Sequence, residues 1–333
     1  MISMRFDLRV PGMDASAIAH QYRAAVGIAR WADQQEAPFQ IGLCEHHASP
    51  DGYMPSPMVM ASAMAAVTTR TPMSIAALLL PFYDPIRLAE DIIVLDHLSG
   101  GRVSYVLGIG YRPEEYALYG LEFDNRGALA EEKLSALLAA LEHAGSTDGD
   151  IGVTPLRRSD VRRLIAWGGG SKAAVKRAGR HGLNFFGQNN FPGLHALYEE
   201  TSRAAGFEPG MCYAPDAANP NIVFVADDID RAWEEVGPAL LHDAMSYAAW
   251  NENAGRDTIS LSQKTSLESL REEQGAYRIV NVDGAVELYE RWGRLALHPL
   301  CGGLTPNVAQ RYLNIVMDSV WPKIKPLVNT NNG

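Results

Sequence analysis

The stretch of sequence that decides the fold class runs from residue 73 to residue 110 and reads MSIAALLLPFYDPIRLAEDIIVLDHLSGGRVSYVLGIG. It opens with an apolar run over residues 73–80, which is the pattern of a strand buried on both faces. A helical pattern occupies residues 85–98, and a second apolar run follows at residues 103–107. A strand, a helix and a second strand in this order are the repeating unit of parallel α/β folds.

The same alternation extends over the whole chain. Short apolar runs that read as strands lie at residues 6–10, 39–44, 73–80, 103–107, 163–166, 183–186, 222–226 and 294–297. Eight such units predict a (β/α)₈ TIM barrel, because an open doubly wound sheet typically carries about five or six strands. We expect a single barrel domain over residues 1–328, with a polar insertion at about 243–275 before the last strand and a disordered tail at 329–333.

The composition indicates a globular protein with an acidic balance. Of its 333 residues, 47% are hydrophobic, and 39 acidic residues against 29 basic ones give a net charge of −10. This charge argues against a general affinity for nucleic acid. The sequence contains neither an apolar stretch of membrane-spanning length nor a signal-peptide pattern, so no membrane association is expected.

The three cysteines do not form a recognisable set. Cys44, Cys212 and Cys301 lie far apart and include no CxxC pair. Neither a disulfide framework nor a structural zinc site is therefore expected, and a reducing cytoplasm is the expected location.

Candidate binding residues follow the strands, because barrel active sites form at the carboxyl ends of strands. The clearest signal is the run Gly168, Gly169, Gly170 and Ser171, which leads into a helix rich in lysine and arginine. Glycines there let backbone amides approach an anion at the helix N-terminus, so the run predicts a phosphate site. The alternative is a plain tight turn beside a solvated basic face.

Two adjacent histidines, His46 and His47, follow the second predicted strand. Strand alternation lets only one of them face the barrel mouth. A metal site is not expected, since His298 is the one obvious second ligand and catalytic zinc sites use three protein ligands. A single histidine at this position acts in proton transfer or is a buried structural residue.

Three segments together resemble the bacterial luciferase-like flavin monooxygenase family. They are CEHH at residues 44–47, the segment from DPIRLAED to LSGGR within residues 76–120, and WGGGS at residues 167–171. The resemblance covers most of residues 1–190 and, more weakly, residues 298–324. It implies a (β/α)₈ barrel, usually dimeric, that holds reduced FMN or the related deazaflavin coenzyme. The EHH form favours FMN, because deazaflavin-dependent relatives tend to show an Asp-His pair there.

The resemblance also assigns roles to individual residues. It places His46 near the reactive edge of the flavin and a cis peptide between Ala76 and Ala77 beneath the ring. The cofactor-binding residues that it implies are Ala76, Ala77, Gly108, Gly168, Gly169, Gly170 and Ser171, and Arg112 is added as a further phosphate contact. Phe82, Tyr83, Tyr111 and Leu300 are expected to form apolar walls of a substrate pocket, which the insertion around Trp250 closes. Gly108 and Ile109 stand where luciferase has a reactive Cys and an Arg, so light emission is not expected.

These assignments imply a monooxygenase that uses reduced FMN, supplied by a separate reductase, and O₂. The expected reaction proceeds through a flavin C4a-hydroperoxide and oxygenates a small hydrophobic substrate, with His46 donating or moving a proton. Two alternatives remain open at this point. One is a deazaflavin-dependent oxidoreductase of the same fold, and the other is a flavin-binding protein without turnover.

Overall fold

The computed structural model describes residues 1–145, 152–253 and 262–330. Its strands are β1 (Ile2–Phe6), β2 (Phe39–Leu43), β3 (Met73–Leu79), β4 (Val103–Gly108), β5 (Ile165–Gly169), β6 (Asn184–Gly187), β7 (Cys212–Tyr213), β8 (Ile222–Val225), β9 (Tyr277–Val280) and β10 (Leu295–Leu297). Its α-helices are α1 (Ala15–Gln34), α2 (Pro57–Ala65), α3 (Pro85–Ser99), α4 (Pro113–Leu118), α5 (Arg126–Glu142), α6 (Val161–Leu164), α7 (Lys172–Arg180), α8 (Leu194–Ala204), α9 (Ile229–Asn253), α10 (Leu267–Glu273), α11 (Val282–Trp292), α12 (Pro306–Ile315) and α13 (Trp321–Thr330).

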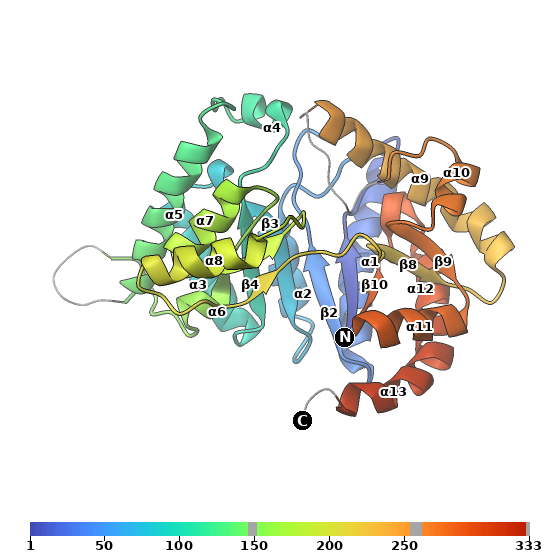
Figure 1. Cartoon of the computed structure of the whole chain (residues 1–333). Coiled ribbons are helices and arrows are strands. Elements are labelled where there is room, and N and C mark those ends of the chain that lie inside the picture. Colours follow the sequence, from blue (N-terminus) through green and yellow to red (C-terminus); the bar gives the residue numbers. More distant parts are fainter. Residues whose placement is uncertain (146–151, 254–261, 331–333) are drawn as a thin grey trace.

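All of these strands pair in parallel within one sheet, with helices packed around it (Figure 1). The order is β7-β6-β5-β4-β3-β2-β1-β10-β8-β9, so the chain comes back to the free side of β1 through β10. Within the described residues, hydrogen-bonded pairing ends at β7 on one side and at β9 on the other. The carboxyl ends of neighbouring parallel strands meet at one rim, where the candidate residues were expected.

The structure corrects the position of the first strand. Residues 6–10 were expected to form it, but β1 runs over Ile2–Phe6. Ile2, Met4 and Phe6 are fully buried and alternate with two half-buried residues, and β1 pairs with both β2 and β10 in this register. The shift brings Arg5 to the end of β1, a position that the expected strand did not give it.

Two strands, β7 and β9, were not predicted from the sequence. β7 is only two residues long, and β9 lies just after the segment expected to be an insertion. Such short runs give too few alternating positions to distinguish them from loops. A strand lies at or next to each of the eight expected positions, although β5 begins at Ile165 and residues 163–164, where it was expected to start, belong to α6. β7 and β9 are added at the two edges of the sheet.

The expected insertion and tail are partly helical. Residues 243–253 form the last turns of α9 and not a polar loop, whereas 254–261 lie outside the described residues. At the C-terminus, α13 continues to Thr330, so residues 329 and 330 belong to a helix, and 331–333 lie outside the described residues. Within the part of the chain that the structure describes, no helix combines the length and apolarity that crossing a membrane requires.

Asp33, near the end of α1, anchors the turn that precedes β3. Its carboxylate accepts hydrogen bonds from the backbone amides of Thr69, Arg70 and Thr71, at 2.8 to 2.9 Å, and from two threonine hydroxyls. Burial would raise the pKa of Asp33, but these hydrogen bonds outweigh it and lower the pKa.

We expect Asp33→Ala to lower the free energy of unfolding by about 2 to 4 kcal/mol, because several buried donors lose their charged acceptor. Since the pKa is lower in the folded state, this stabilisation is present above the ordinary pKa of 3.8 and is lost as the pH falls below it. Urea unfolding at neutral and acidic pH measures both effects. A loss below about 0.5 kcal/mol at neutral pH would contradict the anchoring role.

Candidate active site

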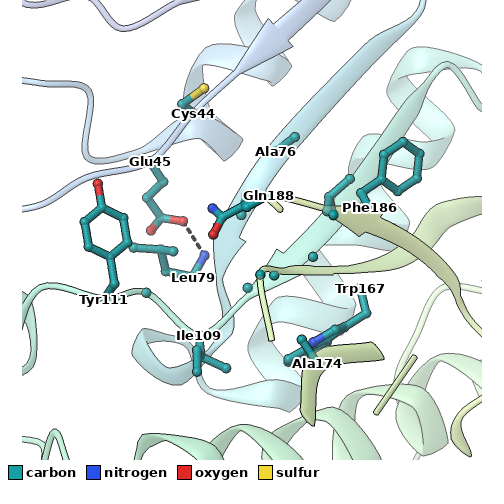
Figure 2. Close-up of a pocket in the computed structure, with 18 of the residues that line it drawn as sticks. Cys44, Glu45, Ala76, Leu79, Ile109, Tyr111, Trp167, Ala174, Phe186 and Gln188 are labelled. Carbon is teal, nitrogen blue, oxygen red and sulfur yellow. Dashed lines mark hydrogen bonds between the residues drawn. The ribbon is translucent and has the colours of Figure 1, made fainter. Parts of the chain in front are cut away.

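A cavity of about 670 Å³ opens at the rim formed by the strand ends. It is lined from β1 by Arg5, from the end of β2 by Cys44, Glu45 and His46, and from β3 to β6 by the residues that end those strands. Figure 2 shows Cys44, Ala76, Phe186 and Trp167 around this space. Tyr247 and Asn251 reach it from α9.

Most of the cofactor residues expected from the sequence lie together on this cavity. The lining includes His46, Ala76, Ala77, Gly108, Gly168, Gly169, Gly170, Ser171 and Tyr111. The structure therefore brings together residues from the ends of four strands, β2 to β5.

Four expected site residues lie outside the lining. Phe82 stacks on Tyr119, and the Tyr83 hydroxyl donates to Glu45 at 2.8 Å. Leu300 is fully buried in the core. Arg112 is buried as well, and its Nη1 donates to the His47 carbonyl at 2.6 Å. Each of these groups is occupied by protein contacts, so none forms a wall of the cavity.

The glycine run forms a close turn at the start of α7. Gly169 has a φ of 155°, and a Cβ there would lie 2.7 Å from the Cβ of Ala174. Only glycine therefore fits without moving the helix. Ser171 caps α7, with its Oγ accepting from the amide of Ala174 at 3.2 Å. The cavity thus borders the positive end of a helix dipole.

Two arginines line the cavity near this turn. Arg177 is held by Glu131, at 2.7 Å from Nε to Oε2, and its guanidinium lies over the Trp167 ring. Arg126 begins α5, and its Nη1 donates to the Phe123 carbonyl at 2.8 Å. Within the described residues, no carboxylate pairs with Arg126. Its charge is therefore available to an anion in the cavity.

Small residues from two adjacent strands line the middle of the cavity. Ala76 and Ala77 are joined by a cis peptide bond, as expected, and both line the cavity. A Cβ at Gly108 would lie 3.0 Å from the Cβ of Ala77, so glycine leaves space between β3 and β4. Without large side chains at these positions, a flat ring has room to lie against the backbone.

His46 is paired with a buried carboxylate. Its Nδ1 lies 2.9 Å from Oε1 of Glu115, and its ring meets Tyr53, Tyr111 and Trp250 at centroid distances of 4.8 to 5.5 Å. Burial lowers the pKa of His46, although Glu115 opposes this shift. The ring is therefore neutral near pH 7, with Nδ1–H donated to the carboxylate and Nε2 left as a proton acceptor.

Glu115 stays ionised in spite of its burial. Burial alone would raise the pKa of its carboxyl group, but the hydrogen bonds from His46 and the His47 amide and the charge of Arg112 lower it. The carboxylate in turn fixes the tautomer and the orientation of His46. The sequence patterns did not indicate this pairing.

His47 turns away from the cavity. Its Nε2 lies 2.8 Å from Oε1 of Glu45, and its Nδ1 lies 3.2 Å from the Tyr119 hydroxyl. Glu45 also accepts from the amide of Leu79 at 2.8 Å, the dashed line in Figure 2. His47 and Glu45 thus tie the end of β2 to β3, while His46 borders the cavity.

A buried ionic cluster lies beyond β1. Arg9 pairs with Asp51 at 2.6 Å and lies 3.3 Å from both Asp7 and Asp243. Burial would raise the pKa of Asp7, but His298 and Arg9 lower it to about 2. The sequence pattern did not indicate this cluster, because Asp7 and Arg9 lie within the strand expected at residues 6–10.

His298 also belongs to a group of three residues whose side chains are of the kinds that bind metal ions. The ligand atoms of Asp7, His298 and Cys301 lie within 4.8 Å of one another. Burial raises the pKa of the Cys301 thiol, and Arg9 already neutralises Asp7. This arrangement favours an ion pair within the protein over a bound cation.

Comparison with known proteins identifies the family. Residues 4–284 match the family described as luciferase-like monooxygenase. The chain belongs to this family. The resemblance of its strand-end motifs is thereby confirmed.

Curated relatives of this luciferase-like chain match shorter segments. The alkanal monooxygenase alpha chain of Photorhabdus luminescens is 32% identical over 91 residues, which are 27% of this chain and 25% of that protein. An uncharacterised protein y4wF of Sinorhizobium fredii is 36% identical over 111 residues, 33% of this chain and 32% of that protein. The chain thus spans about a quarter to a third of the length of these two relatives.

Solved structures match almost the whole chain. The monooxygenase RslO1 from Streptomyces bottropensis has a TM-score of 0.70 and 20% identity, covering 97% of this chain and 99% of that one. The oxygenating constituent of 3,6-diketocamphane monooxygenase from Pseudomonas putida, in complex with FMN, has a TM-score of 0.60 and 17% identity, covering 97% and 98%. An F420-dependent secondary alcohol dehydrogenase, F420 being the deazaflavin coenzyme, has a TM-score of 0.59 and 13% identity, covering 96% and 98%. Together with the family match, these likenesses confirm the expected luciferase-like (β/α)₈ barrel fold.

Proposed function

We propose that this luciferase-like protein is a monooxygenase that uses reduced FMN and O₂ to oxygenate a small hydrophobic substrate. The observation that carries the proposal is the set of residues that line one cavity. It combines a glycine turn at a helix N-terminus, small residues beside it, and a buried histidine whose free nitrogen is a base. These are the three environments that a phosphate, a flat ring and a proton-transfer step require.

The residues present fit FMN. Backbone amides of Gly169, Gly170 and Ser171 would hold the phosphate at the start of α7, with Arg126 supplying a positive charge. Ala76 and Ala77 leave room for the flavin ring beside them. When bound in its reduced form, FMN supplies the electrons for activation of O₂.

The protein itself contributes a base, His46, in a site from which bulk water is excluded. His46 accepts a proton at Nε2 and releases it again, while Glu115 keeps Nδ1 protonated. Aromatic rings of Tyr53, Tyr111 and Trp250 pack around His46 and keep bulk water away from it.

Two rival functions differ from this proposal in testable ways. A deazaflavin-dependent oxidoreductase would transfer hydride without consuming O₂, and an F420-dependent enzyme is among the structures similar to this chain. A flavin-binding protein without turnover would need no buried base. The His46–Glu115 pair therefore argues against the second rival, and the EHH form at residues 45–47 favours FMN over the first.

We further propose that the chain forms a homodimer through α2 and α3. Val59 on α2 and Val94 and Leu98 on α3 are 51 to 66% exposed, and Ile86 at the start of α3 is 49% exposed. A second copy of the chain is the expected partner, because the family that the sequence resembles is usually dimeric.

We expect Leu98→Glu to convert the dimer to a monomer, since it places two charges in a symmetric apolar interface. Light scattering after gel filtration measures the mass. Met211→Glu is the matched control, because Met211 is similarly exposed but lies next to β7. A wild-type protein that is already monomeric would contradict the proposal.

The remaining parts of the proposal concern the domain organisation, the partners and the cellular location. Residues 1–328 would form one domain, and a separate reductase would deliver reduced FMN. A reducing cytoplasm fits the three cysteines, which are all free. The net charge of −10 disfavours nucleic acid as a partner.

Labelling with ¹⁸O₂ tests the function. Reduced FMN is bound under anaerobic conditions and then mixed with ¹⁸O₂ and a panel of aliphatic aldehydes and cyclic ketones. Mass spectrometry should find one ¹⁸O atom in a product. If all compounds are returned unchanged while the reduced deazaflavin transfers hydride to a carbonyl compound, the deazaflavin alternative replaces the proposal.

A further inference from the structure

We propose that Arg5 binds a carboxylate group of the substrate, so that the substrate is an apolar molecule with an anionic end. This inference rests on the proposed function and specifies its substrate class. The structural basis is a guanidinium that borders the cavity without a close partner of its own. It lies four strands away from the glycine turn at residues 168–171, the proposed phosphate turn.

Arg5 reaches the cavity because of the alternation along β1. Ile2, Met4 and Phe6 are fully buried in the core, and the residues between them belong to the opposite face. In the parallel pairing with β2, Arg5 lies opposite Gly42, which has no side chain to cover it. The Arg5 side chain is 26% exposed and lines the cavity together with Cys44 and Tyr247.

The contacts of Arg5 with the protein are long. Its Nη2 lies 3.5 Å from Nδ1 of His298 and 3.7 Å from Oδ2 of Asp243. Its Nε is buried and has no hydrogen-bond partner among the described residues. Arg9, by contrast, lies 2.6 Å from Asp51. A half-buried guanidinium that lacks close acceptors gains more from an incoming anion than a paired one does.

Asp243 does not fill this role, because it has other partners. Its Oδ2 accepts a hydrogen bond from the Tyr277 hydroxyl at 2.9 Å, and its Oδ1 lies 3.3 Å from Nε of Arg9. The pair with Arg5 is the longest of the three contacts. The donors of Arg5 that face the cavity therefore remain for a ligand.

The chemistry of the site selects a carboxylate. A guanidinium offers a planar fork of N–H groups, which matches the two oxygens of a carboxylate. Ile222, Phe186 and Ala76 line the same cavity and offer apolar surface to the rest of the molecule. Oxygen atoms of the flavin ring are another possible acceptor, and the experiment distinguishes the two.

Binding of matched probes tests the proposal. Octanoate and octanamide have the same chain and differ in charge, and calorimetry measures their affinities for the protein saturated with oxidised FMN. FMN occupies the phosphate turn, so octanoate cannot bind there. We expect octanoate to bind at least tenfold more tightly than octanamide. Arg5→Met should weaken octanoate binding at least tenfold and leave octanamide binding unchanged, and Arg5→Lys should retain part of the preference.

Arg87→Met is the control, because the Arg87 side chain is 71% exposed on α3, and it should change neither affinity. Equal binding of the two probes, absence of octanoate binding, or a preference that survives in Arg5→Met would each overturn the proposal. So would an Arg5→Met protein that loses FMN affinity but keeps the preference, because Arg5 would then contact the flavin. A wild-type protein that binds neither oxidised nor reduced FMN would instead contradict the proposed function.

Discussion

Replacing His46 with alanine is expected to reduce substrate oxygenation by about 10² to 10⁴, the usual contribution of a positioned proton-transfer group. His46 borders the cavity and is the proposed base, and its Nδ1 is hydrogen-bonded to Glu115. FMN affinity should change little, because the phosphate turn lies on β5, three strands away from β2. Two measurements show the effect. One is product formation from the compound that incorporates ¹⁸O, and the other is the rate at which bound reduced FMN is reoxidised.

His47→Ala is the matched control and should act mainly on stability, since His47 contacts Glu45 and Tyr119 and not the cavity. The pH profile gives a second readout. Because burial lowers the pKa of His46, the neutral base should persist below the ordinary value of 6.5, and activity should fall only at lower pH. Glu115→Gln removes the charge that opposes this shift, so the fall should move to still lower pH. Equal activity of His46→Ala and wild type would leave His46 with a structural role only.

Replacing Arg126 with methionine is expected to weaken FMN binding by about 10- to 100-fold, because a charge-assisted hydrogen bond to phosphate contributes about 1.5 to 3 kcal/mol. Arg126 lines the cavity and has no carboxylate partner among the described residues, so its charge is available to the phosphate. Riboflavin lacks the phosphate, and its affinity should therefore be the same in both proteins. Quenching of flavin fluorescence measures all four affinities.

Arg180→Met is the control for this substitution. Arg180 is the last residue of α7 and also pairs with Glu131, but its side chain is 49% exposed and does not line the cavity. It should leave FMN affinity unchanged. If FMN and riboflavin lose affinity equally in Arg126→Met, the arginine acts on the shape of the site and not on the phosphate.

The sequence predicted the fold class because the strand pattern repeats and each unit adds evidence. It failed where the pattern was short or ambiguous. Residues 2–6 and residues 6–10 both alternate, and only pairing with β2 and β10 selects the first. β7 and β9 are held by pairing at the sheet edges and not by a strong apolar run of their own.

The residues of the candidate site also differ in whether the sequence could indicate them. His46 and the glycine turn have local signals, because a strand end and a run of glycines are visible in a few consecutive residues. Glu115 and Arg126 follow loops, and their importance arises from contact with residues distant in sequence. Phe82 and Leu300 follow strands as expected, but Leu300 is buried in the core and Phe82 stacks on Tyr119, and no linear pattern indicates either contact.

Reduced FMN is the proposed ligand of this cavity, where it would react with O₂. The most direct measurement is anaerobic titration of the wild-type protein with reduced FMN and with the reduced deazaflavin coenzyme, followed by absorbance. We expect FMN to bind at least tenfold more tightly than the deazaflavin, and the FMN complex to be reoxidised when oxygenated buffer is added. Tighter binding of the deazaflavin, or no binding of either, would contradict it.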